Sequence, residues 1–313
     1  MIDHQRRVYD SMLGLLSNED NPTPLVRLNS VTPFEHAQVY GKLEWYNPFG
    51  AIKDRVAANM ILDAEEQGIL ASDQKLVEPT SGNTGMGLAM ISNLKGYSLT
   101  TPLSSAIPLE KRTMLRFFGA DVIELEDTLC PAPGAPEGAI AKAEELGARP
   151  DFHMLNQYRN EANPGAHYKT TGPEIWRQTD GSVTHFVAGL GTSGTFVGTT
   201  RRLKEFNPEI KGISFMPDSP FHGLEGLKHM STSIVPRIYD PSVADENLGI
   251  STEESQKMVI RLAREEGLFA GLSSGAAMVA ALKVAENIDR GTIVTMFPDG
   301  GDKYLSEEFW NTP

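Results

Sequence analysis

The sequence contains a single cysteine among 313 residues, which excludes an internal disulfide and a metal site built from cysteines. Basic residues are also scarce, because 28 Lys and Arg stand against 41 Asp and Glu and give a net charge of −13. This balance argues against a nucleic-acid-binding protein and against attachment to an anionic membrane. An anionic substrate would need local hydrogen-bond donors, since the global field opposes it.

Long apolar segments are missing as well. No run of 18 apolar residues occurs, so nothing in the sequence predicts a membrane span. Residues 1–16 contain Arg6 and Arg7 but no continuous apolar segment of the kind found in signal peptides. We therefore expect a cytoplasmic protein with no bound metal. The one cysteine, Cys130, precedes an expected surface loop at 131–138 and is interpreted as an incidental thiol.

What the sequence does contain is an alternation of short apolar segments with amphipathic ones. The first series predicts strands at 39–45, 75–78, 97–101, 122–125 and 153–155, with helices from 53 and at 84–94, 110–118 and 137–146. The second series predicts strands at 184–188, 212–216 and 292–297, with helices at 196–206, 253–266 and 276–286. An earlier helix is indicated by Val8, Met12, Leu15 and Leu16. The helix from 53 has its apolar residues, including Val56 and Met60, at helical spacing, and Ser251 and Glu254 are placed as a capping box for the helix at 253. Such alternation predicts an α/β fold of β-α-β units around mostly parallel sheets.

Two series of this kind predict two three-layer α/β domains with a cleft between them. We expect residues 1–45 to form an N-terminal segment that packs on the C-terminal domain. Residues 46–158 would form a smaller, mobile domain, and residues 159–313 the C-terminal domain. The boundary between these two domains is placed from the polar composition of residues 158–163.

The stretch Asn47-Pro48-Phe49-Gly50-Ala51-Ile52-Lys53-Asp54-Arg55 is the centre of the functional hypothesis. A loop ends at Gly50 and a helix begins near Lys53, where the helix macrodipole disfavours a positive charge. A lysine at such a position should lose its proton more easily than a free one, and a neutral amine is what Schiff-base chemistry requires. The alternative is an ordinary first-turn lysine that faces solvent.

Three further segments each link an apolar strand to a helix. In the substrate loop (residues 80–84), hydroxyl and amide side chains surround a glycine ahead of a helix, an arrangement that suits a carboxylate. In the phosphate cup (residues 191–195), small and hydroxyl residues suit a phosphate, although the segment is neither a Walker A loop nor a convincing dinucleotide fingerprint. In the third segment (residues 271–275), either Ser273 or Ser274 could give one hydrogen bond to a ligand ring. The alternatives are a capped tight turn for the first segment and an N-cap of the helix at 276 for the last.

A reactive lysine, a carboxylate-shaped loop and a separate phosphate cup together predict a pyridoxal-phosphate enzyme that acts on an amino acid. The sequence from 21 to 306 also resembles the cysteine synthases of fold-type II, a group that includes cystathionine β-synthase and shares the tryptophan synthase β-like fold. The resemblance rests on specific motifs: Lys42-Leu43-Glu44, the Lys53 stretch, Glu78 to Gly85, Ala162-Asn163-Pro164, Thr170 to Ile175, Gly191 to Thr195 and Ser273 to Ala277.

The resemblance implies a role for each matched residue. Lys53 would hold the cofactor aldehyde as a Schiff base, Asn83 would bond the ring hydroxyl, and Ser273 would meet the pyridine nitrogen. The cofactor phosphate would be held by Gly191, Thr192, Ser193, Gly194 and Thr195. The substrate carboxylate would be held by Thr80, Ser81, Gly82, Thr84 and Gln157, with Asn83 beside them.

Within that family the sequence is most similar to the cysteine synthase B and O-phosphoserine sulfhydrylase branch. It departs from those relatives at Lys228, where they carry arginine, and this departure leaves the choice between O-acetyl-L-serine and O-phospho-L-serine open. The resemblance implies L-cysteine synthesis by a homodimer, with serine acetyltransferase or a sulfur-carrier protein as a partner. The alternatives are a serine or threonine dehydratase and a non-catalytic binding partner of serine acetyltransferase.

Overall fold

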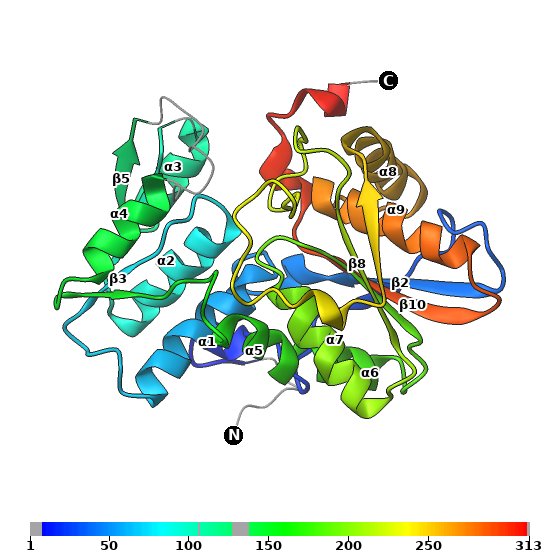
Figure 1. Ribbon diagram of the computed structural model, residues 1–313, viewed down its shortest axis with the longest axis horizontal. Coiled ribbons are helices and arrows are strands. Elements are labelled where there is room, and N and C mark those ends of the chain that lie inside the picture. Colours follow the sequence, from blue (N-terminus) through cyan, green and yellow to red (C-terminus); the bar gives the residue numbers. More distant parts are fainter. Residues whose placement is uncertain (1–7, 106, 127–137, 312–313) are drawn as a thin grey trace. The chain divides into compact units, whose positions relative to one another are not determined.

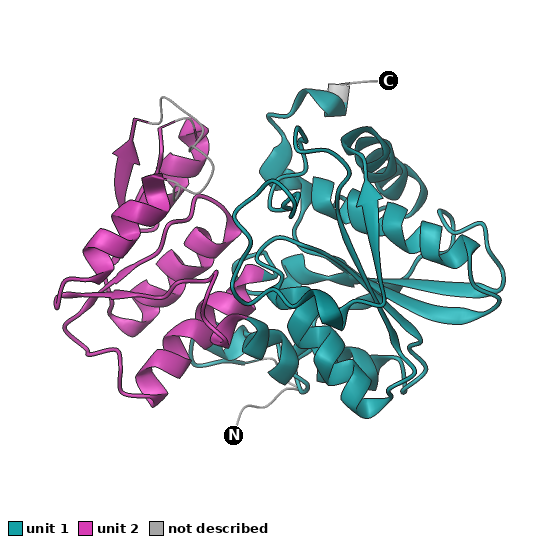
Figure 2. Ribbon diagram, viewed as in Figure 1, with its two compact units in different colours: residues 1–52, 164–313 teal, residues 53–163 magenta. Residues whose placement is uncertain are grey.

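The computed structural model describes residues 8–105, 107–126 and 138–311, and it divides into two compact units (Figure 2). Unit 1 comprises residues 1–52 and 164–313, and unit 2 comprises residues 53–163. The sequence predicts boundaries after residues 45 and 158, whereas the structure has them after residues 52 and 163. Cys130 and the loop expected after it lie outside the described residues, apart from Gly138, which begins a helix.

Unit 1 is organised around a six-stranded sheet (Figure 1). Only its edge strand β1 runs antiparallel to its neighbour β2, and the other adjacent strands of this sheet are parallel. The N-terminal strands therefore belong to the same sheet as the C-terminal ones. In spatial order the strands are β1 (Leu25–Arg27), β2 (Ala37–Leu43), β10 (Gly291–Phe297), β7 (His185–Gly189), β8 (Lys211–Pro217) and β9 (Glu246–Ile250).

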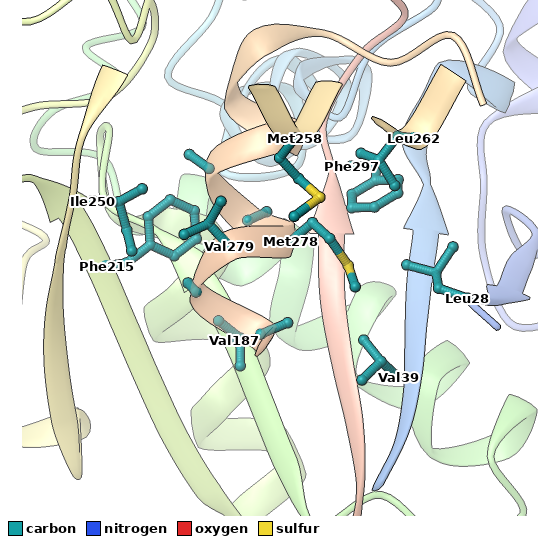
Figure 3. Packing of buried hydrophobic residues seen from close by; sticks show 14 of the residues in the cluster. Leu28, Val39, Val187, Phe215, Ile250, Met258, Leu262, Met278, Val279 and Phe297 are labelled. Atoms are coloured by element: carbon teal, nitrogen blue, oxygen red, sulfur yellow. The ribbon is translucent and has the colours of Figure 1, made fainter. Parts of the chain in front are cut away.

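Helices cover both faces of this sheet. Successive side chains of its central strand β7 point to opposite faces, and the apolar side chains on each face are buried by helices. Val187 of β7 belongs to a core with Met278, in which β-strand side chains pack against α8 and α9 (Figure 3). Its neighbours Phe186 and Ala188 belong to a second core with Phe196, which packs against α6 and α7. The covering helices are α6 (Thr171–Gln178), α7 (Gly194–Phe206), α8 (Thr252–Glu265) and α9 (Leu272–Glu286).

Unit 2 contains a four-stranded parallel sheet in the order β5 (Asp121–Leu125), β4 (Leu99–Ser104), β3 (Lys75–Val77) and β6 (Phe152–Met154). Its helices are α1 (Lys53–Glu66), α2 (Asn83–Lys95), α3 (Leu109–Phe117) and α4 (Gly138–Gly147). Helix α4 packs against Val77 and Phe152 of the sheet. The apolar stripe of α1, including Val56 and Met60, is fully buried, as its spacing predicts.

The predicted α/β class with mostly parallel sheets is confirmed. The predicted capping box of α8 is also present, since Ser251 Oγ accepts the N–H of Glu254 at 3.1 Å and the Glu254 carboxylate accepts the N–H of Ser251. Two helix predictions need correction. The early amphipathic stretch forms only a 3-10 turn at Met12–Leu15, and α9 begins at Leu272, four residues before the predicted start.

Four elements of the structure are not predicted from the sequence: α5 (Ala162–Lys169), α6, β1 and β9. Helix α5 contains Pro164 and Gly165, and α6 contains Gly172 and Pro173, residues that weaken helix propensity even though proline fits a first helical turn. The two strands are short and lie at the edges of their sheet, where few residues carry the strand signal. In the part of the chain that the structure describes, no helix is long and apolar enough to cross a membrane.

Candidate active site

The substrate loop lies in unit 2, between the carboxyl end of β3 and the start of α2. Gly82 occupies the N-cap position of α2 and has no side chain with which to cap it. Thr80 takes over part of that task, because its Oγ1 accepts the N–H of Gly85 at 3.2 Å. Thr101 holds the same residue from β4 by donating its hydroxyl to the Thr80 carbonyl at 2.6 Å. The loop is therefore held in shape before any ligand binds.

Gln157 lies at the same edge of that sheet. It follows β6, which pairs in parallel with β3, so that both strands end side by side. The Thr84 hydroxyl donates to Gln157 Oε1 at 2.9 Å, and both side chains are buried. Asn163 fixes the Gln157 backbone by donating from Nδ2 to its carbonyl oxygen at 2.8 Å. The structure thus brings Gln157 together with Thr84, although the two are far apart in sequence.

Lys53 is the first residue of α1. Burial lowers the pKa of its amine from 10.5 to about 8, while the negative charge of Glu78 acts in the opposite direction. The helix start predicts a lowered pKa for Lys53, and the structure agrees, although the dominant cause is burial rather than the macrodipole. An amine with this pKa is neutral far more often near neutral pH than an ordinary lysine, and it can attack an aldehyde.

Glu78 is a buried carboxylate that lies in the Glu78 to Gly85 motif of the sequence but has no predicted role. Burial raises its pKa from 4.5 to about 7, and this rise is opposed by hydrogen bonds from Gln157 and Asn156 and by the charge of Lys53. The signal available in the sequence was an acidic residue placed directly after the buried strand β3.

The phosphate cup lies in unit 1, at the junction of β7 and α7. Ser193 is the N-cap of α7 and adopts a left-handed conformation with φ of 73°, but its side chain makes no capping bond. Its Oγ is buried and has no hydrogen-bond partner among the residues that the structure describes. A buried hydroxyl without a partner is costly, and it lies beside the positive end of a helix. These features fit a bound phosphate group.

A buried histidine, His167, contacts the phosphate cup at Thr195. Thr195 Oγ1 lies 3.2 Å from His167 Nε2, and His167 Nδ1 lies 2.9 Å from Thr171 Oγ1. Helix α7 approaches α5 closely, because a Cβ at Gly198 would lie 2.0 Å from the carbonyl oxygen of Pro164. His167 has no predicted role, because α5, the helix that carries it, is not predicted from the sequence.

Ser273 lies within the first turn of α9, and the N-cap residue of this helix is Gly271. The alternative that a serine of this segment caps a helix at 276 is therefore wrong. The Gly271 N–H donates to the carbonyl of Asp299, just beyond the end of β10, at 3.0 Å. The strands β10 and β7 are parallel neighbours, so their carboxyl ends lie at the same edge of the sheet of unit 1. Ser273, through the Gly271–Asp299 bond, and the phosphate cup both lie at this edge.

Lys228 is joined to the cup through its backbone. Its N–H donates to the carbonyl of Leu190 at 2.8 Å. The preceding turn, at Gly226, has φ of 83°, and its carbonyl lies so close to Gly191 that a Cβ there would be only 2.3 Å away. Gly191 is therefore required for this packing, and the segment with Lys228 is held against the phosphate cup.

The predicted site residues thus form two groups, one in each unit, at the carboxyl ends of parallel strands. Within unit 1, the N–H of Ile52 donates to the Pro298 carbonyl at 2.8 Å, and Lys53 follows Ile52 in the chain as the first residue of unit 2. Within the described ranges, no group of three or more His, Cys, Asp or Glu could hold a metal ion.

Comparisons with known proteins agree with this chemistry. A family model described as pyridoxal-phosphate dependent enzyme matches residues 16–299. The chain is 41% identical over 310 residues to a cysteine synthase of Aquifex aeolicus, which covers 96% of this chain and 92% of that protein. It is 39% identical over 284 residues to cysteine synthase B of Escherichia coli, with 91% and 92% covered. A crystal structure of a cysteine synthase from Entamoeba histolytica matches with a TM-score of 0.90 at 31% identity, covering 100% of this chain and 94% of that one.

Proposed function

The chain belongs to the family of pyridoxal-phosphate-dependent enzymes, and from this premise we propose that it makes L-cysteine from an activated serine and sulfide or another sulfur donor. The activated serine is O-acetyl-L-serine or O-phospho-L-serine. The observation that carries the proposal is Lys53, an amine at a helix start whose pKa burial lowers to about 8. The names of the cysteine synthase relatives support the choice of reaction.

The residues present fit the cofactor. The phosphate cup offers uncapped N–H groups at the start of α7 and the unpartnered Ser193 hydroxyl to the phosphate. Asn83 would bond the ring hydroxyl and Ser273 the ring nitrogen. When bound, pyridoxal phosphate supplies an aldehyde for the amine and a conjugated ring that withdraws electrons from the amino-acid carbon.

The chain's own residues would then carry the reaction. The neutral Lys53 amine takes the proton from Cα of the activated serine as general base. Acetate or phosphate leaves from Cβ, sulfide forms the new bond to Cβ, and the proton returns to Cα. The Ser273 hydroxyl would give the ring nitrogen a hydrogen bond without the negative charge of a carboxylate, and the weaker electron withdrawal that results would favour β-elimination.

The substrate loop and Gln157 would hold the carboxylate of the amino acid. Thr80, Ser81 and Thr84 supply hydroxyl groups, Asn83 and Gln157 supply amides, and Gly82 lets the ligand approach the backbone at the start of α2. Lys228, fixed against the phosphate cup through its backbone, would meet the leaving group of the activated serine.

The decisive experiment compares steady-state L-cysteine formation from O-acetylserine and from O-phosphoserine, each with sulfide. We expect sulfide-dependent cysteine formation with at least one of them. Release of a keto acid and ammonia from serine or threonine, with no need for sulfide, would indicate the dehydratase alternative. A purified chain without visible cofactor absorbance and without turnover would indicate a non-catalytic binding protein.

The proposal includes an assembly and a location. We infer a homodimer in the cytoplasm, with serine acetyltransferase or a sulfur-carrier protein as a partner, from the likeness to the cysteine synthases. The single cysteine is compatible with a reducing compartment. Light scattering of the purified enzyme, with and without the candidate partner, tests the assembly, and cell fractionation tests the location.

A further inference from the structure

Both carboxyl oxygens of Glu78 accept hydrogen bonds from the backbone of the segment that carries Gln157. Oε2 accepts the N–H of Asn156 at 2.7 Å, and Oε1 accepts the N–H of Gln157 at 3.1 Å. The glutamate itself is fixed at the end of β3, because its own N–H donates to the Thr100 carbonyl at 3.2 Å. Both bonds are charge-assisted when the carboxylate is ionised, and such bonds are stronger than neutral ones.

The held segment has a backbone conformation that needs support. Asn156 has φ of 55°, in the left-handed region that residues with a side chain rarely adopt. The carboxylate of Glu78 binds the N–H groups at and after this residue, so it stabilises the turn that directs Gln157. The side chain of Gln157 is held from two sides, because its amide also hydrogen-bonds the Glu78 carboxylate and the Thr84 hydroxyl donates to its Oε1 at 2.9 Å.

We propose that Glu78 is a positioning residue, whose two oxygens fix the turn at Asn156 and so aim the Gln157 amide at the substrate carboxylate. This role rests on the proposed function, since it assigns an amino-acid carboxylate to the substrate loop. Glu78 acts through Gln157 and not on the reacting atoms. The negative charge of Glu78 also raises the pKa of Lys53, the reacting amine.

Glutamine at position 78 is the informative replacement. Glu78→Gln keeps the volume but offers only one acceptor oxygen to two N–H donors, and its amide group would face the other donor. The turn at Asn156 should loosen while the apolar surroundings of the side chain stay filled. Glu65→Gln is the control in the same unit, because the Glu65 carboxylate accepts the Tyr97 hydroxyl at 2.9 Å and pairs with Lys95 at 2.9 Å.

The test uses the holoenzyme and L-alanine, an amino acid with the same carboxylate and no leaving group. Binding is measured from the visible absorbance of the bound cofactor. We expect the Kd for L-alanine and the KM for the activated serine to rise about tenfold in Glu78→Gln and in Gln157→Ala. The double variant should be no more than about threefold weaker than either single one, because both changes remove the same interaction. Backbone hydrogen exchange at 152–160 should increase in Glu78→Gln and not in Glu65→Gln.

Two results would overturn the role of Glu78. One is a double variant whose losses multiply to about a hundredfold, which would make the two residues independent. The other is a Glu78→Gln enzyme with reduced thermal stability but an unchanged Kd, as a purely structural role would give. If Glu78→Gln does not fold, Glu78→Asp, which withdraws the carboxylate by one methylene, is measured against the same expectations. A wild-type enzyme that binds L-alanine but forms no cysteine would overturn the proposed function alone, and one that does neither would overturn both.

Discussion

Nζ of Lys42 lies 2.7 Å from Oε2 of Glu174, and neither side chain has any exposed surface. The ammonium also donates to the Thr23 carbonyl at 3.1 Å and to Gln178 Oε1 at 2.9 Å. Lys42 belongs to β2 and Glu174 to α6, so the ion pair ties an N-terminal strand of unit 1 to a helix that covers the sheet. The Lys42 motif of the sequence is thus a structural element rather than part of the candidate site.

Removing one partner of this pair should destabilise the protein strongly. Lys42→Met takes the Lys42 charge away from the buried Glu174 carboxylate, and we expect a loss of about 3–5 kcal/mol in the free energy of unfolding. The double variant Lys42→Met/Glu174→Leu should recover much of this loss, since it replaces both members of the pair with apolar side chains. Urea unfolding of the three variants measures both. A single variant as stable as the wild type would contradict this account.

Lys53→Ala should abolish turnover and the visible absorbance of bound cofactor while the fold stays intact. The reason is that no other residue is proposed to supply the amine. Circular dichroism and thermal unfolding serve as the control for folding. The assignment would be wrong if the variant retained about a tenth or more of wild-type turnover, equivalent to a loss of only ~1.4 kcal/mol in transition-state stabilisation.

The pKa of Lys53 makes a separate prediction for the apoenzyme. Only the neutral amine attacks the aldehyde of added pyridoxal phosphate, and the neutral fraction rises with pH until the pKa is passed. Because burial lowers this pKa to about 8, the rate of cofactor capture should rise about tenfold per pH unit below that value and level off above it. Stopped-flow absorbance at several pH values measures the rate. A rate that keeps rising toward pH 10 would show an ordinary lysine.

Ser193→Ala should separate cofactor binding from folding. The Ser193 hydroxyl is buried and bonds to none of the described residues, so its removal should not destabilise the apoenzyme. The holoenzyme should lose a hydrogen bond to a charged group, worth ~1.5–3 kcal/mol of cofactor affinity. Equilibrium titration of the apoenzyme tests this. Gly194→Asp, which places a negative charge in the cup, is a positive control with a larger loss. An unchanged cofactor affinity in both variants would show that the cofactor phosphate binds elsewhere.

The sequence was most informative where periodicity is strong and local. The buried stripe of α1 and the capping box of α8 were predicted from their spacing, and the α/β class followed from the alternation of segments. It was least informative where proline and glycine lie inside helices. Helix α5 was missed for this reason, and with it the contact between His167 and Thr195.

Contacts between distant segments were also beyond the sequence. Glu78 and Gln157 are 79 residues apart, and only the parallel pairing of β3 and β6 places their strand ends side by side. Likewise, the local capping pattern indicated a helix start near Ala276. The structure begins α9 at Leu272, because the Gly271 N–H is already bound by the Asp299 carbonyl on a distant strand end.

The last prediction concerns substrate choice at Lys228. A lysine offers the leaving group a point charge, whereas the arginine of the related branch can bind a phosphate with two parallel hydrogen bonds. We therefore expect O-phosphoserine to be accepted but less strongly preferred than in relatives with arginine, with O-acetylserine as a true competitor. Lys228→Ala should lower kcat/KM for O-phosphoserine about tenfold or more, or ~1.4 kcal/mol, and should affect O-acetylserine much less.

Lys228→Arg is the matched variant, since it keeps the charge and the backbone bond to Leu190 while adding a bidentate donor. It should shift the ratio of kcat/KM values toward O-phosphoserine, whereas Lys228→Ala shifts it toward O-acetylserine. Because both substrates share the carboxylate and the reacting carbons, the ratio isolates the leaving group. Equal losses for both substrates in Lys228→Ala would show that the lysine only shapes the segment packed on Gly191. No change for either would show that it is a surface residue without a part in substrate choice.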